Sequence, residues 1–373
     1  MNIIEIIQAN LLTPIILFFI LGIVAARVKS DLRIPDAISS FLPIYLLAAI
    51  GLHGGIEMRS SGLQNIVLPI IVAIALSITM TLNHFVILNK IGKFNIFDSY
   101  ALAATYGSVG AVTFSVGLSF LNNQNIPSEG YVAAILAVLE PISLVLAIFL
   151  VNMASAKKLK EKRKYLENEE EREKAEIKDK KTNLNINDDN KKEIGEVRVP
   201  KESIKEILHE TLAGKSIIIL LGAIMIGFII GKEGFESIKL PFEGLFEGAL
   251  VIFLIEMGVI AGQRLNDIKK AGSFLIAFAI LIPIFNGMIG VVIASYIGLS
   301  IGGAVMFALL LASASFIAAP AVLRTAIPKA NPSFYITSAL GISFPFNIIV
   351  LLPILLIVST ALHDVSGPIS LFR

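Results

Sequence analysis

The sequence predicts an all-α polytopic membrane protein with about ten transmembrane helices, arranged as two inverted five-helix repeats whose fourth and ninth helices are interrupted. Three observations lead to this fold class. Hydrophobic residues make up 55% of the 373, and the mean hydropathy is +0.80, so a water-soluble fold would expose too much apolar surface. Apolar runs of membrane length follow one another along the chain. Similar segments then recur in the same order in both halves.

The predicted spans are runs close to the roughly 20 apolar residues that a helix needs to cross a bilayer core. They are Leu11–Ala26, Ala37–Leu52, Ile66–Leu88, Ser99–Leu121, Gly130–Ala154, Ser216–Gly231, Phe242–Ala261, Phe274–Ile297, Ile301–Leu323 and Phe334–Ala361. Several runs contain Pro or Gly, so the number of spans is better defined than their ends.

The placement of lysine and arginine predicts the sidedness, because cytoplasmic loops retain positive charge. The loops after the odd-numbered spans carry Arg27, Lys29, Arg33, Lys90, Lys93, Arg264, Lys269, Lys270, Arg324 and Lys329. The opposite loops carry only Arg59, Lys232 and Lys239. We therefore expect a multi-pass protein of the inner (plasma) membrane with both termini outside.

Residues 156–211 form the one long hydrophilic segment, between a first repeat at residues 1–155 and a second, inverted repeat at residues 212–373. More than half of the lysine and arginine of the chain lies in it, interleaved with acidic residues. Lys157–Lys181 has the composition of a solvated helix, and Thr182–Asn190 that of a polar linker. We interpret the segment as a cytosolic connector, or alternatively as a docking platform for a regulator.

The two halves share a plan. Aligning Tyr131 with Tyr335 superimposes YVAAILAVLEPISLVLAIFL on YITSALGISFPFNIIVLLPI and brings Pro141 onto Pro345. Each repeat would hold an odd number of spans, so the second copy enters the membrane inverted, as in many secondary transporters. Chance similarity between apolar helices is the alternative.

Two interrupted helices at equivalent places carry the strongest functional signal. Thr105–Ala111 contains glycines, and Ala312–Pro320 contains two serines and a proline. Such residues can break the helical hydrogen-bond ladder and free backbone groups that must find partners. Half-helix N-termini suit an anion, while carbonyl and hydroxyl oxygens suit a sodium ion. Alternatively, the small residues serve only close helix packing.

Two acidic residues lie inside predicted spans, where an unpaired carboxylate is costly. Glu140 lies beside Pro141 in the fifth span and is the candidate to ligate a cation or to be protonated during a cycle. Glu256 lies in the seventh span and is interpreted as a structural partner of Ser or Asn side chains.

Other classes of function find little support in the sequence. The chain has no cysteine, and its four histidines do not show a metal-binding spacing. The net charge of +2 gives no reason to expect nucleic-acid binding. Nucleophile elbow, HExxH, Walker and dinucleotide motifs are all missing, so we do not expect an enzyme.

Several motifs of the chain resemble the sodium-dependent bicarbonate permease family of the cyanobacterial SbtA type. They are IPDAIS (Ile34–Ser39), IGLHGG (Ile50–Gly55), GSVGAVTF (Gly107–Phe114), HETLAGK (His209–Lys215) and LRTAIPKANPSFYI (Leu323–Ile336). The resemblance covers both membrane halves at similar spacing, but not the central hydrophilic segment.

This resemblance implies a homotrimer driven by a sodium gradient, in which spans three to five and eight to ten form a mobile core against a gate. It also implies a PII-like cytosolic regulator and a substrate held between the tips of the fourth and ninth helices. The substrate-binding residues expected here are Gly107, Ser108, Thr113, Ser313, Ser315 and Ala319. The sodium-binding residues expected are Ser108, Ser315 and Glu140.

The chain departs from the family pattern at these tips. Gly110 and Val112 replace serines, and Ala314, Phe316 and Ala318 stand where polar or acidic groups are expected. Three hypotheses follow. The first is a sodium-coupled symporter of a small anion, most directly bicarbonate. The second is a transporter of another organic anion or a monocarboxylate, favoured by Phe316 and Phe344, and the third is a transport-deficient receptor or scaffold that recruits a cytosolic partner.

Overall fold

The computed structural model describes residues 8, 10–62, 64–140, 142–147, 149–151 and 215–366, and all of its regular elements are helices. The central hydrophilic segment at residues 156–211, with the helix expected at Lys157–Lys181, lies outside the described residues, as does most of HETLAGK.

The labelled α-helices are α2 (Pro14–Arg27), α3 (Asp36–Ser61), α4 (Gln64–Val86), α5 (Ile96–Gly107), α6 (Ala111–Asn123), α9 (Lys215–Phe235), α10 (Phe246–Tyr296), α11 (Ile301–Ala312), α12 (Ala318–Ala326), α13 (Pro332–Ile336), α14 (Phe344–Phe346) and α15 (Leu352–Ser366). A further helix covers Val132–Val151. Wider π-helical turns extend α4 at Ile87–Ile91 and join α13 to α15 at Thr337–Ser343 and Asn347–Leu351.

Eight segments of the described chain are long and apolar enough to cross a membrane. They are Asp36–Ser60, Gln64–Ile91, Ile96–Asn123, Val132–Val151, Ile217–Ile238, Leu240–Arg264, Gly272–Tyr296 and Pro332–Asp364. Two shorter apolar helices lie at predicted spans as well: Pro14–Arg27 at the first, and Ile301–Ala312 at the first half of the ninth. The prediction of a polytopic helical membrane protein is therefore confirmed, whereas the ten-helix inverted repeat stays a prediction.

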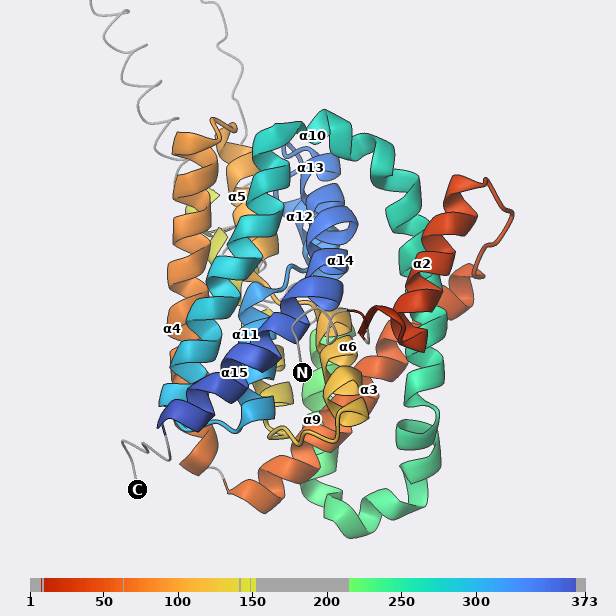
Figure 1. The fold of residues 1–373 in the computed structure, drawn as a ribbon, viewed down its shortest axis with the longest axis vertical. Helices are drawn as coiled ribbons and strands as arrows, with labels where there is room; N and C mark the ends of the chain where they lie inside the picture. The colour runs from red at the N-terminus through yellow and green to blue at the C-terminus, as the bar shows by residue number, and fades with distance from the viewer. Residues whose placement is uncertain are drawn as a thin grey trace, which may run out of the picture.

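One group of helices consists of two closely packed pairs, α2 with the first part of α10 and α3 with α9, on the right and lower side of Figure 1. Glycines allow the backbones to touch. A Cβ atom at Gly55 of α3 would overlap the carbonyl oxygen of Ile224 in α9, and one at Gly227 would overlap that of Leu52. Small residues bring membrane helices together in this way because dispersion and weak polar contacts need close approach.

The second group contains α4, α5, α6, the Val132–Val151 helix, the last part of α10 and α11 to α15. Its centre is the segment Ile96–Asn123, most of which is buried inside the protein. Such a segment is hydrophobic on all sides because protein rather than lipid surrounds it. The group therefore encloses the helix that the sequence predicts to be interrupted.

Helix α10 connects the two groups by arching over one end of the molecule (Figure 1). The sequence predicts separate spans at Phe242–Ala261 and Phe274–Ile297, and the structure has two membrane-length segments there, Leu240–Arg264 and Gly272–Tyr296, joined through α10. Gly272 is the non-helical residue inside it, with φ of 79° and ψ of 158°. A left-handed φ is accessible to glycine because it has no Cβ atom, so the chain reverses there with little loop.

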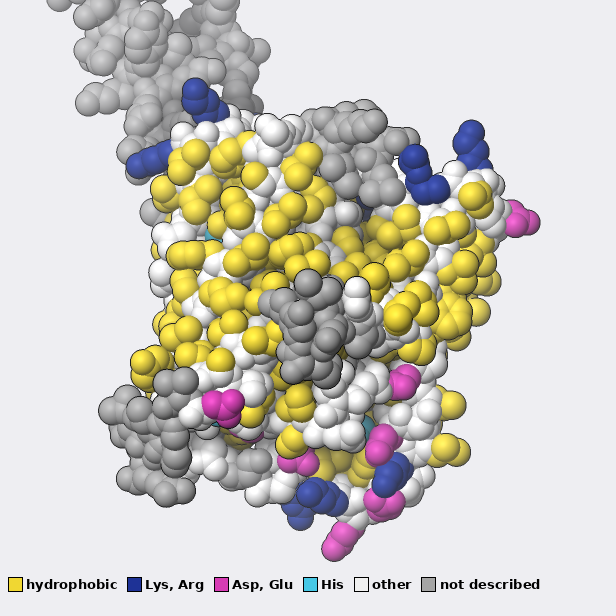
Figure 2. Space-filling view, viewed as in Figure 1, with side chains coloured by type: hydrophobic (Ala, Val, Ile, Leu, Met, Phe, Trp, Pro, Cys, Tyr) yellow, Lys and Arg dark blue, Asp and Glu magenta, His cyan; other side chains and the backbone are white. Residues whose placement is uncertain are grey.

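The surface agrees with a membrane environment. Figure 2 shows hydrophobic side chains in a broad band across the face, between charged side chains at the two ends. Lysine and arginine predominate at one end of this face and acidic side chains at the other. A band of this kind is what a bilayer core requires of the atoms that face it.

Filling one of the helix contacts tests the packing of the first group. We expect Gly55→Ala to lower the free energy of unfolding by about 1–3 kcal/mol, because its Cβ atom has no space between α3 and α9. Thermal unfolding in detergent measures the change. Gly222→Ala is the matched control in α9, since its Cβ atom meets nothing within 4 Å. Equal behaviour of the two variants would contradict the packing described.

Candidate functional site

The segment Ile96–Asn123 is interrupted at its middle. Helix α5 ends at Gly107, Ser108 is extended (φ −86°, ψ 156°), and α6 begins at Ala111 after Gly110 (φ −104°, ψ 109°). The expected break is therefore present, over three residues. Ser108 donates a hydrogen bond from Oγ to the backbone oxygen of Glu140 at 2.9 Å, which ties the break to the Val132–Val151 helix.

The second interruption separates α11 from α12. Helix α11 ends at Ala312, Ser313 is extended (φ −77°, ψ 163°), and α12 begins at Ala318. Ser315 accepts a hydrogen bond at Oγ from the backbone N–H of Ala319 at 3.1 Å, so it satisfies one of the free donors at the start of α12. This break is also where the sequence predicts it.

The two breaks bind each other. The N–H of Gly110 donates to Oγ of Ser313 at 2.9 Å, and the N–H of Ser315 donates to the carbonyl of Thr105 at 2.9 Å. These partners come from opposite halves of the chain. Two unwound segments that the sequence could only place on separate helices thus meet at one point.

Two buried asparagines hold the end of α11, and sequence reasoning missed both. Asn286 donates from Nδ2 to the carbonyl of Leu311 at 3.1 Å, and Asn347 donates to that of Ala312 at 2.9 Å. The final carbonyls of a helix have no intrahelical partner, so these amides replace the missing donors. The available signal was an amide side chain in an otherwise apolar span, because buried polar groups are rarely left without a role.

A small cavity of about 30 Å³ lies where the breaks face α3, which is room for about one water molecule. Its lining residues are Pro43, Leu46, Leu47, Val109, Gly110, Ala111, Val112, Ser115, Glu140, Ser315, Phe316, Ile317 and Ala318. Both breaks contribute to one wall, and α3 provides the other. The cavity therefore lies between the two groups of helices.

Glu140 is the acidic residue of this cavity. Its side chain is only 3% exposed, and among the described residues its Oε2 atom has no hydrogen-bond partner. A buried carboxylate is stable only with a hydrogen-bond donor, a proton or a cation beside it. The unsatisfied oxygen therefore fits a cation or a proton at the cavity.

The predicted site residues fall into two sets. Ser315 and Glu140 line the cavity. Gly107, Ser108, Thr113, Ser313 and Ala319 lie at or beside the breaks without appearing in the cavity lining. Ser115, which lines the cavity and donates to the carbonyl of Ala111 at 3.0 Å, was not singled out from the sequence as a ligand.

Glu256 lies apart from the cavity, in the first group of helices. It accepts a hydrogen bond from Oγ of Ser39 in α3. This contact agrees with its interpretation as a structural partner of a serine side chain, and it makes Glu256 a useful comparison for Glu140.

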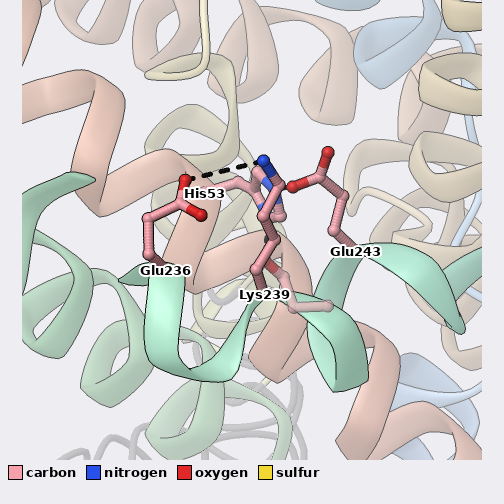
Figure 3. Close-up of polar contacts among 5 residues, drawn as sticks. His53, Glu236, Lys239 and Glu243 are labelled. Atoms are coloured by element: carbon pink, nitrogen blue, oxygen red, sulfur yellow. Dashed lines mark hydrogen bonds and ion pairs between the residues drawn. The ribbon is translucent and has the colours of Figure 1, made fainter. Parts of the chain in front are cut away.

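A second cavity, of about 370 Å³, lies between α3, α6, the residue 127–130 loop and the start of α10. Glu57, Glu129, Glu243 and Glu247 are among its lining residues. Figure 3 shows His53 beside Glu243, with Nε2 and Oε2 4.0 Å apart, and the neighbouring pair of Lys239 and Glu236 at 3.5 Å. In the part of the chain that the structure describes, clusters of three or more metal-ligating side chains are not found.

No curated protein matches the chain. The sequence profile of one family matches residues 14–360, nearly the whole chain, and that family consists of transporters rather than enzymes. The resemblance to a sodium-dependent bicarbonate permease family is thereby confirmed. The chain belongs to the Na+-dependent bicarbonate transporter superfamily.

Proposed function

We propose that the protein is a sodium-coupled symporter of a small anion, most directly bicarbonate, which works by alternating access of a core domain against a gate domain. Membership of the Na+-dependent bicarbonate transporter superfamily supports the substrate and the coupling ion. The observation that carries the proposal is the meeting of the two helix breaks at one cavity, with Glu140 in its wall.

The anion would bind to the starts of α6 and α12. Ala111 and Ala318, the first residues of these helices, both line the cavity. Free N–H groups and the positive end of a helix dipole favour an anion without requiring a cationic side chain. Neither Lys nor Arg belongs to the described lining of this cavity, so backbone donors would supply the recognition.

The sodium ion would bind near Glu140. A hard cation prefers carboxylate, hydroxyl and carbonyl oxygens, and Glu140 and Ser315 present such atoms at the cavity. A cation and an anion bound close together also neutralise each other, which lowers the cost of placing either one in a low-dielectric site. This mutual neutralisation is a physical basis for coupling their transport.

The two groups of helices correspond to the proposed gate and core. Pro43, Leu46 and Leu47 of α3 cover the cavity from the gate side. Movement of the core past α3 would open the site to one membrane face at a time, as expected for inverted repeats with a site at the midplane. Ten spans, external termini and a cytoplasmic central segment complete this proposal, and the uneven distribution of charge in Figure 2 favours that orientation.

A second candidate substrate is a less hydrophilic organic anion or a monocarboxylate. Phe316 lines the cavity, and its ring centroid lies 5.0 Å from that of Phe344. Aromatic rings at this position would accommodate an apolar substituent that bicarbonate lacks. The homotrimer and the PII-like regulator implied by the resemblance also stay predictions.

Uptake of labelled bicarbonate into proteoliposomes tests the main proposal. We expect saturable uptake with an inward sodium gradient, and little uptake when potassium replaces sodium. Uptake that is absent, or equal in both salts, would refute sodium-coupled bicarbonate transport.

Removing the charge at the cavity tests the sodium site. We expect Glu140→Gln to raise the sodium concentration for half-maximal uptake about tenfold or more, because an amide binds a hard cation less strongly than a carboxylate. Glu256→Gln is the matched control, since it removes another intramembrane carboxyl away from the cavity. A normal sodium dependence in Glu140→Gln would exclude Glu140 as a sodium ligand.

Ligand-induced stabilisation separates the two substrate candidates. A ligand that binds the folded protein raises its melting temperature, and more so at higher concentration. We expect bicarbonate to stabilise the purified protein in sodium buffer, and Phe316→Ser to leave that effect in place. Stabilisation by acetate or lactate but not by bicarbonate would instead support the organic-anion candidate.

A further inference from the structure

Asp98 bonds the N-terminal end of α5, the end distant from the break, to the other half of the chain. Its side chain lies in the first turn of α5 and is 6% exposed. Oδ1 accepts a hydrogen bond at 2.6 Å from the backbone N–H of Asn331, in the loop between α12 and α13. Asn95 donates to Oδ2 at 2.5 Å. Both oxygens of the carboxylate are therefore satisfied, one of them by a backbone group of the second half.

Glu129 makes the corresponding link at the start of α11. It lies in the loop after α6, where Oε1 accepts from the backbone N–H of Ser300 at 2.6 Å and Oε2 from Oγ of Ser300 at 2.9 Å. Ser300 in turn caps α11 by accepting from the N–H of Gly303 at 3.1 Å. A Cβ atom at Gly303 would overlap Oε2 of Glu129, so the glycine leaves room for the carboxylate.

The two links lie at the ends of α5 and α11 that are distant from the breaks. Helices α5 and α12 are connected near the break by Ser315 and Thr105. At the other end of α5, Asp98 in its first turn accepts from Asn331, the N-cap of α13. Helices α6 and α11 are connected near the break by Gly110 and Ser313, and beyond their far ends through Glu129. Helices α5 and α11 are each bonded to the other half of the chain at both of their ends.

We propose that Asp98 and Glu129 are positioning residues that set the spacing of the half-helix tips at the transport site. Helices α5 and α11 each have 12 residues, a rigid length of about 18 Å. A shift of the N-terminal end of either helix is thus transmitted to its C-terminal end at the break. Carboxylates suit this role, because they favour helix N-termini and bind backbone N–H groups strongly. This role rests on the proposed function, since the tips matter only if they bind substrate.

Kinetics of charge-removing variants provide the first test. We expect Glu129→Gln and Asp98→Asn each to raise the KM for bicarbonate about tenfold, while the maximal rate per inserted protein stays within about twofold. Glu243→Gln is the matched control for Glu129, because it removes an exposed carboxylate from the same larger cavity without contacting a half-helix. An unchanged KM in both Glu129→Gln and Asp98→Asn, or an equal rise in Glu243→Gln, would overturn the proposal.

Hydrogen–deuterium exchange provides a readout that does not need transport. Glu129→Gln should speed exchange in the peptide that contains Gly110, and Asp98→Asn in the peptide that contains Ser315, each leaving the other peptide unchanged. General destabilisation would instead speed hydrogen–deuterium exchange in both peptides of both variants, and that result would overturn the positioning role. If the wild-type protein shows no flux, the proposed function fails, whereas this exchange pattern still decides the role of the two carboxylates.

A covalent cross-link in place of the bond between Glu129 and Ser300 tests whether the KM can be restored. The chain contains no cysteine, so Glu129→Cys with Ser300→Cys creates the one thiol pair available to a short bifunctional thiol reagent. We expect the untreated double variant to show a raised KM and the cross-linked protein to recover it. Cross-linking that abolishes uptake would show that α6 and α11 have to separate during transport, contrary to the proposal.

Discussion

The structure depends on one constraint: a backbone N–H or C=O group inside a membrane must find a partner within the protein. Each helix break removes hydrogen bonds from its own ladder. Gly110 and Ser313 restore one of them across the two breaks, and Ser315 and Thr105 restore another. The breaks therefore stabilise each other, and a chain with one break alone would carry unsatisfied groups in lipid.

The same constraint explains the polar side chains behind the breaks. Asn286 and Asn347 supply amide donors to the last carbonyls of α11, and Ser108 supplies a hydroxyl to the backbone at Glu140. With so many backbone groups already bonded, few polar atoms stay available to a ligand. Oε2 of Glu140 is one of five buried side-chain atoms without a partner among the described residues, and Glu140 is the one of these residues that lines the cavity between the breaks.

The carboxylates differ in how they are bonded at the cavity and at the ends of α5 and α11. Asp98 in the first turn of α5 and Glu129 beside the N-cap of α11 both have their two carboxylate oxygens bonded within the protein. Glu140 lies among apolar side chains with one oxygen unbonded. A carboxylate that is fully bonded adds rigidity, whereas one without a partner attracts a counter-ion. In the proposed function, the first two carboxylates support the site and Glu140 binds the ion.

The sequence alone determined that the chain is helical and membrane-embedded, because hydropathy and run length depend only on local composition. It also located both breaks at Thr105–Ala111 and Ala312–Pro320, since Gly and Pro act on the residues next to them. Glu140 could be chosen as a functional acid because a carboxylate in an apolar run is costly wherever that helix packs.

Only the tertiary structure decided which residues meet. The bond from Gly110 to Ser313 and the links of Asp98 and Glu129 join positions that are distant in the sequence, and no local pattern encodes them. The split of the predicted ligands, with Ser315 and Glu140 at the cavity and Thr113 away from its lining, was equally hidden. Which way a side chain faces in a helix that is apolar on all sides depends on the neighbours packed against it, and those are set by the fold.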